Sequence, residues 1–294
     1  MKNIALILYR FSVIFCLQEF MLLATDWETT SAGKLAIFSM EHAPYPDTSR
    51  VDGYTRKDEF YPAAIHYNDQ SVAIFVPAGF RPEKSVDLLF YFHGHNNNIR
   101  KSLDKFSLRE MVFASGKNLI LVFPQGPKDA RDSGYGKLES IGGFKRLAVE
   151  VLDTLKMERV IEHQNLGSVI LAGHSGTYRV IGQILKQGGM TDKIREVYLL
   201  DATYAQLDIF EDWITSDGKK IFRSIFTDHL APENVTLMKN LSRQNLPFKL
   251  LAEEAVVAGD LENRILFLHA ADLSHAETVN WLERFLRNSL VPDK

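Results

Sequence analysis

The segment that says most about the fold reads Ser168-Val-Ile-Leu-Ala-Gly-His-Ser-Gly-Thr-Tyr178. Its first part, 168–172, is β-branched and apolar, which predicts a buried strand, and a helical pattern follows Thr177. A serine at such a strand-to-helix turn is held in a strained conformation above the sheet, and small neighbours prevent clashes. Gly173 meets that demand, whereas Thr177 stands where the pattern usually has glycine. We predict that Ser175 is a nucleophile; the alternative is that it only caps the helix.

Strands and helical patterns alternate through most of the chain. Apolar runs typical of strands lie at 34–38, 71–76, 87–93, 118–123, 168–172, 196–200, 221–227 and 264–269. Helical patterns lie at 142–157, 177–187, 232–243 and 275–288. From residue 87 onward the strands are almost continuously apolar, as strands covered on both faces are. We therefore predict an α/β fold: a mostly parallel central sheet flanked by helices on both faces, with an antiparallel N-terminal edge, in one domain over 25–294.

The composition excludes several classes of protein. A chain of 294 residues, 46% hydrophobic and 24% charged, suits one large α/β domain. Because 34 Lys and Arg face 37 Asp and Glu, the net charge is −3, which argues against a nucleic-acid-binding surface. The chain has no phosphate-binding glycine loop and no basic-aromatic stripe, so neither nucleotides nor nucleic acids are predicted partners. The single cysteine, Cys16, cannot form an internal disulfide.

The first 24 residues have the pattern of a targeting segment. An apolar run reaches from Ile4 to Ala24 and is interrupted by Arg10 and Glu19. The pattern predicts a signal peptide at 1–24; an N-terminal membrane anchor and a helix packed on the domain are the alternatives. We therefore expect an exported protein that is periplasmic, secreted or attached to the cell envelope. No later stretch reaches the about 20 apolar residues that a membrane span needs.

A reactive serine requires a base that takes its proton and an acid that orients the base. When the nucleophile occupies this kind of turn, the acid and then the histidine follow it along the chain. Three histidines follow Ser175, at His229, His269 and His275. His275 lies in the loop beyond the last strand, from which a side chain can reach over the carboxyl edge of the sheet. We predict that His275 is the general base.

Three aspartates are candidates for the acid. Asp201 follows the strand at 196–200, Asp228 follows the strand at 221–227, and Asp272 lies three residues before the predicted base. We favour Asp201 because its strand is the more apolar, and a buried carboxylate at that position needs a partner.

Backbone amides are the predicted donors to the oxyanion that forms during attack. The strand at 87–93 ends in His93-Gly94-His95, and a glycine at a strand end lets N–H groups approach a substrate oxygen closely. Gly176 comes directly before the helical pattern at 177–187, and helix N-termini favour negative charge. We assign the oxyanion hole to amides near Gly94, His95 and Gly176; an ordinary strand-to-helix turn is the alternative.

Together, His93-Gly94-His95, Gly173-His174-Ser175-Gly176, Asp201 and His275 resemble the α/β-hydrolase superfamily over about residues 70 to 290. The resemblance implies a parallel-sheet fold, no cofactor, and esterase-like hydrolysis of an ester, amide or related bond through an acyl-enzyme. Lid insertions in this superfamily usually follow the sixth strand. Only 202–220 lies there, so we expect no large cap domain. An open mouth favours a carboxylesterase or a deacylase that acts on a small molecule or on glycan or peptide material.

The polar stretch 123–137 follows a strand and is expected to line the substrate cleft. In this hypothesis Gln125, Arg131 and Tyr135 make polar contacts with the substrate.

Other functions are weighed against this one. His93 and His95 have the spacing of a zinc pair, but Asn96, Asn97 and Asn98 follow where the familiar metallohydrolase pattern has Asp and another His, so no metal is predicted. An amidase or peptidase of the same fold stays open, because the sequence does not distinguish leaving groups. A non-catalytic envelope binding protein is disfavoured, since a binder does not need serine, base, acid and glycines in this order.

Overall fold

The computed structural model describes residues 26–294. The predicted targeting segment 1–24, with Cys16, therefore lies outside the described residues, and export stays a prediction. Among the described residues, no helix has the length and apolar character required to cross a membrane.

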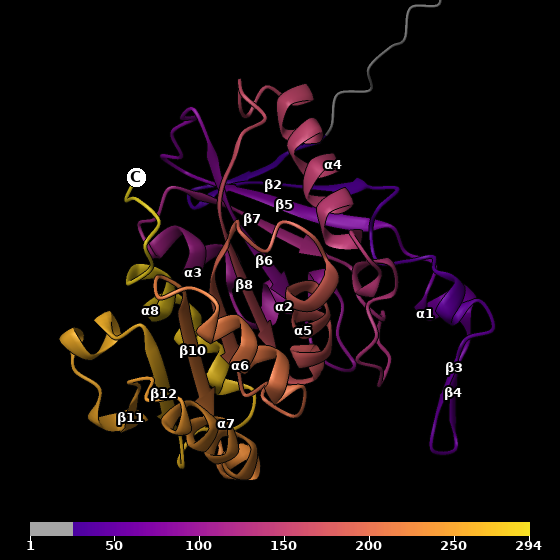
Figure 1. Ribbon diagram of the computed structural model, residues 1–294. Helices are drawn as coiled ribbons and strands as arrows, with labels where there is room; N and C mark the ends of the chain where they lie inside the picture. The colour runs from indigo at the N-terminus through magenta and orange to yellow at the C-terminus, as the bar shows by residue number, and fades with distance from the viewer. Residues whose placement is uncertain (1–25) are drawn as a thin grey trace, which may run out of the picture.

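One ten-stranded sheet runs through the centre of the molecule (Figure 1), in the order β1-β2-β5-β7-β6-β8-β9-β10-β12-β11. The strands are β1 Glu28–Thr30, β2 Gly33–Ser39, β5 Ser71–Pro77, β6 Val86–Phe92, β7 Leu119–Pro124, β8 Leu166–His174, β9 Ile194–Leu200, β10 Ile221–Phe226, β11 Lys249–Ala252 and β12 Ile265–His269. Neighbours from β7 to β11 are parallel, whereas β1, β2 and β5 form an antiparallel edge. The predicted mostly parallel sheet with an antiparallel N-terminal edge is confirmed.

Helices cover both faces of this sheet. The covering helices are α2 Ile99–Lys105, α3 Leu108–Ala114, α4 Gly143–Met157, α5 Tyr178–Gln187, α6 Leu207–Thr215, α7 Ala231–Arg243 and α8 Trp281–Arg287, whereas the short α1, Ala63–His66, lies beside the hairpin described below. One buried apolar cluster joins α4, α5, α6 and α7 to the sheet, and a second joins α2, α3 and α8 to the opposite face.

Strand β6 shows why its sequence is almost wholly apolar. Successive side chains of a strand point to opposite faces, so Leu88 and Phe90 enter the first cluster while Leu89 and Tyr91 enter the second. All four are fully buried. A strand covered on both faces cannot alternate apolar with polar residues, which explains the continuous runs from residue 87 onward.

The connections after β9 and after β2 bear on the site, and the second contains a hairpin that the sequence analysis did not predict. Only α6 lies between β9 and β10, so no large cap domain follows β9 in the described chain. A two-stranded hairpin, β3 Tyr54–Arg56 and β4 Glu59–Tyr61, projects from the body of the molecule (Figure 1). Its three-residue strands are too short to produce a recognisable alternation.

Two buried histidines lie at the carboxyl ends of central strands β6 and β8. The amide of Gly126 donates to Nε2 of His93 at 3.2 Å, so Nδ1 carries the proton and donates to the carbonyl of Gly94 at 2.8 Å. Nε2 of His174 lies 2.9 Å from the carbonyl oxygen of His275 and ties β8 to the loop after β12. Burial lowers the pKa of His93 to about 4 and that of His174 to about 3, so both are neutral near pH 7.

These neutral histidines predict a loss of stability in mild acid. Histidine in the unfolded chain takes up a proton near pH 6.5, whereas His174 in the folded state does so only near pH 3. Between these values the unfolded state binds more protons, so the free energy of unfolding falls as the pH falls. For His174 the loss between pH 6.5 and 4.5 is about 2 kcal/mol. Urea unfolding at several pH values measures it, and His174→Gln should remove that part; an unchanged pH dependence in the variant would contradict the assignment.

Candidate active site

Ser175 lies at the sharp turn between β8 and α5. Its φ is +62°, in the left-handed region that is strained for a residue with a side chain. A short 3-10 turn, Ser175–Thr177, then leads into α5. Gly94, at the end of β6, lies directly against it: a Cβ at Gly94 would come 2.6 Å from the Cβ of Ser175. The loop after β6 therefore approaches the serine as closely as backbone allows.

Thr177, which departs from the usual glycine of this turn, is accommodated by its partner glycine. The threonine is fully buried, and a Cβ at Gly173 would lie only 2.2 Å from its Oγ1. The two positions share one space, so the absence of a side chain at Gly173 makes room for the threonine. The turn keeps its strained geometry although only one of the two positions is glycine.

Asp201 and His275 are joined by a direct hydrogen bond. Nδ1 of His275 lies 2.7 Å from Oδ2 of Asp201, which follows β9 and is fully buried. The amide and the hydroxyl of Thr227 each donate to the same carboxylate at 2.9 Å. Burial alone would raise the pKa of Asp201, but the hydrogen bonds from His275 and Thr227 outweigh it and lower the pKa. The carboxylate is therefore ionised at neutral pH and holds the imidazole.

The ring of His275 packs on that of His174, the residue before Ser175, with the ring centroids 4.3 Å apart. The loop that carries the predicted base therefore lies against the end of β8, one residue before Ser175. The two other candidate acids lie elsewhere. Asp228 is 79% exposed and pairs with His269, whose Nε2 is 2.7 Å away, and Asp272 is exposed.

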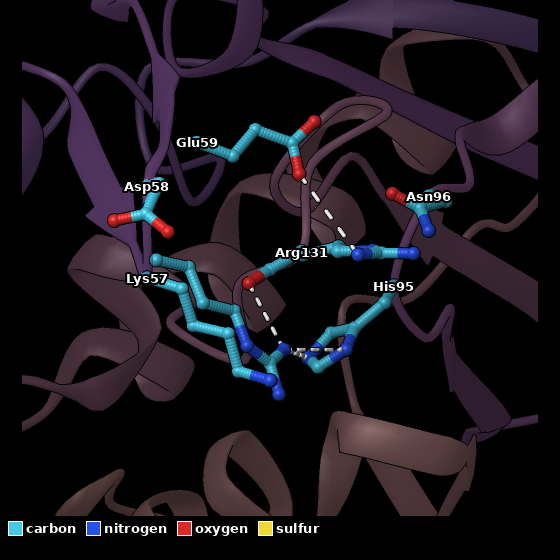
Figure 2. Close-up of a pocket in the computed structure, with 7 residues that line it drawn as sticks. Lys57, Asp58, Glu59, His95, Asn96 and Arg131 are labelled. Atoms are coloured by element: carbon cyan, nitrogen blue, oxygen red, sulfur yellow. Dashed lines mark hydrogen bonds and ion pairs between the residues drawn. The ribbon is translucent and has the colours of Figure 1, made fainter.

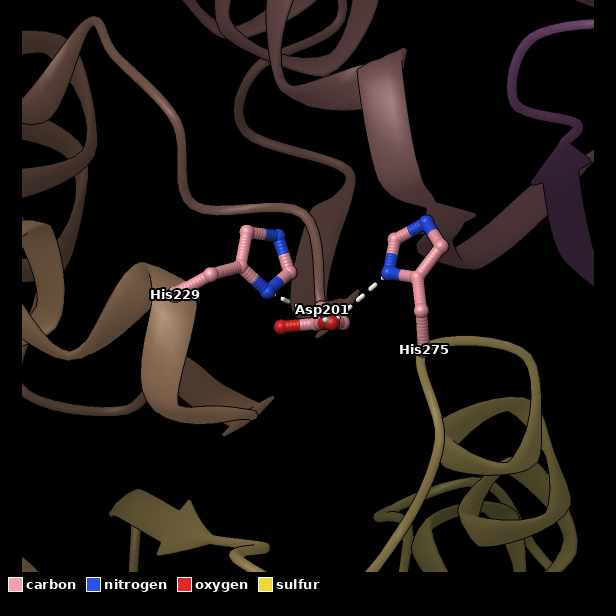
Figure 3. A group of neighbouring side chains, drawn as sticks. All are labelled: Asp201, His229 and His275. Carbon is pink, nitrogen blue, oxygen red and sulfur yellow. Dashed lines mark hydrogen bonds and ion pairs between the residues drawn. The ribbon is translucent and has the colours of Figure 1, made fainter.

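A second polar chain, which the sequence analysis missed, starts at the same carboxylate. Figure 3 shows His229 on the side of Asp201 opposite His275, with its Nδ1 3.7 Å from Oδ2 of Asp201. The hydroxyl of Thr227 donates to Asp201, so Nδ1 of His229 donates to the Thr227 oxygen at 2.6 Å. Nε2 of His229 then accepts from the Tyr204 hydroxyl at 3.0 Å. Burial raises the pKa of Tyr204, and a hydrogen bond with Ser175 opposes the rise. Tyr204, which lines the same cavity as Ser175, is thus connected to Asp201 through His229 and Thr227. Tyr204 stands only three residues after the acid, which is the one signal in the sequence that could have pointed to it.

The histidines do not all serve one site. Ligand atoms of Asp201, His229 and His275 lie within 4.8 Å of one another, close enough to hold a metal ion, but their Nδ1 atoms are already hydrogen-bonded to Asp201 and Thr227. His93 and His95 bind different partners. His93 faces the amide of Gly126, whereas Nε2 of His95 lies 2.9 Å from the hydroxyl of Ser133.

A cavity of about 340 Å³ opens over Ser175 and Gly176. His95 and Ser133 form its wall beside the serine: a Cβ at Gly176 would lie 2.6 Å from the Ser133 hydroxyl and 2.8 Å from Nε2 of His95. The loop after β6 and the start of α5 thus meet at the serine, where the sequence analysis placed the oxyanion-binding amides of Gly94, His95 and Gly176. A neighbouring hollow of about 450 Å³ shares Arg56, His95 and Arg131 with this cavity.

Two of the three residues predicted to line the cleft are buried beneath it, so that part of the hypothesis was wrong. Gln125 is 2% exposed and Tyr135 is 1% exposed. The Tyr135 hydroxyl donates to the carbonyl of His93 at 2.7 Å, and the Gln125 side chain lies 3.0 Å from Nε2 of the same histidine. They satisfy buried polar groups at the end of β6, which would be costly to leave without partners. Arg131 does line the cavity, together with Asp132 and Ser133 of the same loop.

No protein-family model and no curated protein matches this sequence. Solved structures match along most of the chain. A mutant feruloyl esterase module from Clostridium thermocellum, complexed with sinapinate, has a TM-score of 0.52 at 12% identity, over 88% of this chain and 89% of that one. S-formylglutathione hydrolase from Agrobacterium tumefaciens has a TM-score of 0.51 at 11% identity, over 89% and 96%. A ferulic acid esterase has a TM-score of 0.50 at 13% identity, over 74% and 90%.

At these identities the similarity is one of fold. It covers 74–89% of this chain in the three structures named above. The chain therefore has the α/β-hydrolase fold.

Proposed function

We propose that the protein is a serine hydrolase that cleaves ester bonds through an acyl-enzyme, with Ser175, His275 and Asp201 as its catalytic triad. The observation that carries the proposal is the 2.7 Å hydrogen bond between Nδ1 of His275 and the buried carboxylate of Asp201, next to the strained turn of Ser175. Because Asp201 holds the proton on Nδ1, Nε2 is the free base. It takes the Ser175 proton as the oxygen attacks the ester carbonyl.

The negative oxygen of the tetrahedral intermediate is stabilised by backbone amides near Gly94, His95 and Gly176. A Cβ at Gly94 would collide with Ser175 and with the carbonyl of His174, and a Cβ at Gly176 would displace the side chains of Ser133 and His95. Protonated His275 then gives its proton to the leaving alcohol. Water activated by the same histidine releases the acyl group and restores Ser175.

An ester is the preferred substrate class because the similar structures are those of esterases and the cavity over Ser175 is open to a small or medium acyl group. An amidase or peptidase of the same fold is the second candidate. The left-handed φ of Ser175 costs on the order of 1–3 kcal/mol, and its combination with the nearby Asp201–His275 pair favours a catalytic role over a purely structural or binding one. Export through residues 1–24 stays part of the proposal.

Removal of the nucleophile tests the mechanism directly. Ser175→Ala should lower ester turnover by several orders of magnitude, on the ~10⁶-fold scale found when a triad loses its nucleophile. A fluorophosphonate probe should label the native protein and not the variant, and a panel of acyl esters, amides and acetylated sugars measures turnover. Activity that survives in Ser175→Ala but is abolished by a chelator would instead indicate a metal-dependent hydrolase.

The two aspartates at strand ends provide a matched comparison. Asp201→Asn should lower kcat by about 10⁴-fold, because the amide no longer holds the imidazole in the reactive tautomer. Asp228→Asn, an equivalent change at an exposed carboxylate after the next strand, should stay within about threefold of the native rate, as surface changes usually do. A large loss for Asp228→Asn and a small one for Asp201→Asn would show that the acid is assigned wrongly.

His275 is bonded to Asp201 directly, and His229 is connected to it through the second polar chain. Changing each histidine to glutamine therefore separates the contribution of the general base from that of the second chain. His275→Gln removes the base and should cost on the order of 10⁴-fold or more in kcat. His229→Gln removes a hydrogen bond to Tyr204 and should cost roughly tenfold. Steady-state kinetics on one ester measure both effects. Equal losses in the two variants would mean that His275 is not the principal base.

A further inference from the structure

At the mouth of the cavity over Ser175, Arg56 has one hydrogen-bonding edge without a partner among residues 26–294. Resting on the proposed ester hydrolysis, we infer that the preferred ester carries a carboxylate remote from the scissile bond, and that Arg56 binds this carboxylate with help from Arg131. The hairpin β3–β4, on which Arg56 lies, thereby acts as the specificity element of the site.

The other charges around the cavity are already compensated. Asp132 accepts from Arg50, with Nε 2.7 Å from its Oδ2, and its side chain is almost fully buried. Arg179 is paired with Glu139 at 2.8 Å. Because its ion-pair partner neutralises each of them, neither Asp132 nor Arg179 is the main residue that recognises a charged molecule.

Arg56 differs from these residues because no carboxylate within the described chain, 26–294, lies within 4.0 Å of its guanidinium. Its Nη1 donates to the carbonyl of Arg131 at 3.1 Å and to Nδ1 of His95 at 3.0 Å. These contacts hold the guanidinium in place at the mouth. Nε and Nη2, the edge that binds a carboxylate through two parallel hydrogen bonds, have no protein partner in the same described residues.

His95 supports this arrangement as a neutral acceptor. Burial, with the nearby charge of Arg56, lowers the pKa of His95 to about 4, so the ring is uncharged near pH 7. Since Nδ1 accepts from Arg56, Nε2 carries the proton and donates to Ser133 at 2.9 Å. One ring therefore connects the arginine at the mouth with Ser133, whose hydroxyl adjoins Gly176 beside the nucleophile.

Arg131 supplies a second cation on the same wall (Figure 2). Its side chain is 58% exposed, and its only described acidic partner, Glu59, lies at 4.0 Å, the outer limit for an ion pair. Such an exposed ion pair contributes little to stability, so Arg131 can exchange Glu59 for a carboxylate of the substrate. Arg56 and Arg131 both line the cavity over Ser175 and the hollow beside it, so an extended ester can place its carbonyl at the serine and its carboxylate between the arginines.

Three cationic residues, Arg56, Lys57 and Arg131, and two acidic ones, Asp58 and Glu59, line the hollow, so its charge is positive, whereas the whole chain has a net charge of −3. An anionic group is therefore drawn to the mouth of the cavity and not to the surface in general. A carboxylate fits best because its two oxygens match the Nε–Nη2 edge of Arg56.

Two chromogenic esters of equal length test the inference. One is a half-ester of adipic acid, whose far end is ionised, and the other has a neutral carboxamide in place of that carboxylate. The native protein should cleave the carboxylate ester with at least tenfold higher kcat/KM. In Arg56→Gln this preference should fall to about one, with the change appearing chiefly in KM, because the contact is present before and during the reaction. Raising the salt concentration should reduce the native preference.

Arg243→Gln serves as the matched control, since Arg243 is exposed at the end of α7, away from the cavity, and should keep the native preference. Equal hydrolysis of the two esters by the native protein, or a preference that persists in Arg56→Gln, would overturn the anion site while leaving the proposed hydrolase intact. Hydrolysis of neither ester, together with no fluorophosphonate labelling of Ser175, would overturn the proposed function and this inference with it.

Discussion

The site depends on a carboxylate that is buried and yet ionised. Asp201 has no exposure to solvent, and a charge in such a place is costly unless every oxygen has a partner. Two donors from Thr227 and one from His275 supply those partners. The same hydrogen bonds orient the imidazole, which comes from a residue 74 positions further along the chain. The same hydrogen bonds thus satisfy the buried charge and position the base.

The parallel sheet makes this arrangement possible. The carboxyl ends of parallel strands meet at one edge, so the segments that follow β6, β8, β9, β10 and β12 converge although they are far apart in sequence. Gly94 lies against Ser175, and His275 lies over His174, because their strands end at this same edge. The strained backbone of Ser175 is closely packed, with Gly94 on one side of the turn and the pair Gly173 and Thr177 also against it.

The substrate side of the site is built differently, from loops and from a short hairpin. In the absence of a large cap after β9, the walls of the cavity come from β3–β4, the loop after β6 and the loop after β7. Their polar residues are linked to one another: Arg56 to His95, His95 to Ser133, and Arg50 to Asp132. Replacing single side chains on such a surface changes the substrate preference and leaves the sheet below it unchanged. The fold alone therefore does not define the substrate.

The sequence by itself determined the alternation of strands and helices, the parallel sheet with its antiparallel edge, and the turn that carries Ser175. Those features follow from local apolar periodicity and from the steric demands of a tight turn. It also placed Asp201 and His275 at the ends of strands, but it left Asp228 open as the acid. Only the tertiary structure decided which aspartate meets which histidine, since that depends on the order of strands in the sheet. The tertiary structure also turned Gln125 and Tyr135 inward, where they satisfy the buried end of β6, and it brought Tyr204, His229 and Arg56 to the site. These contacts join segments with no common pattern in sequence, and the three-residue strands of the hairpin have no period from which its position could be predicted.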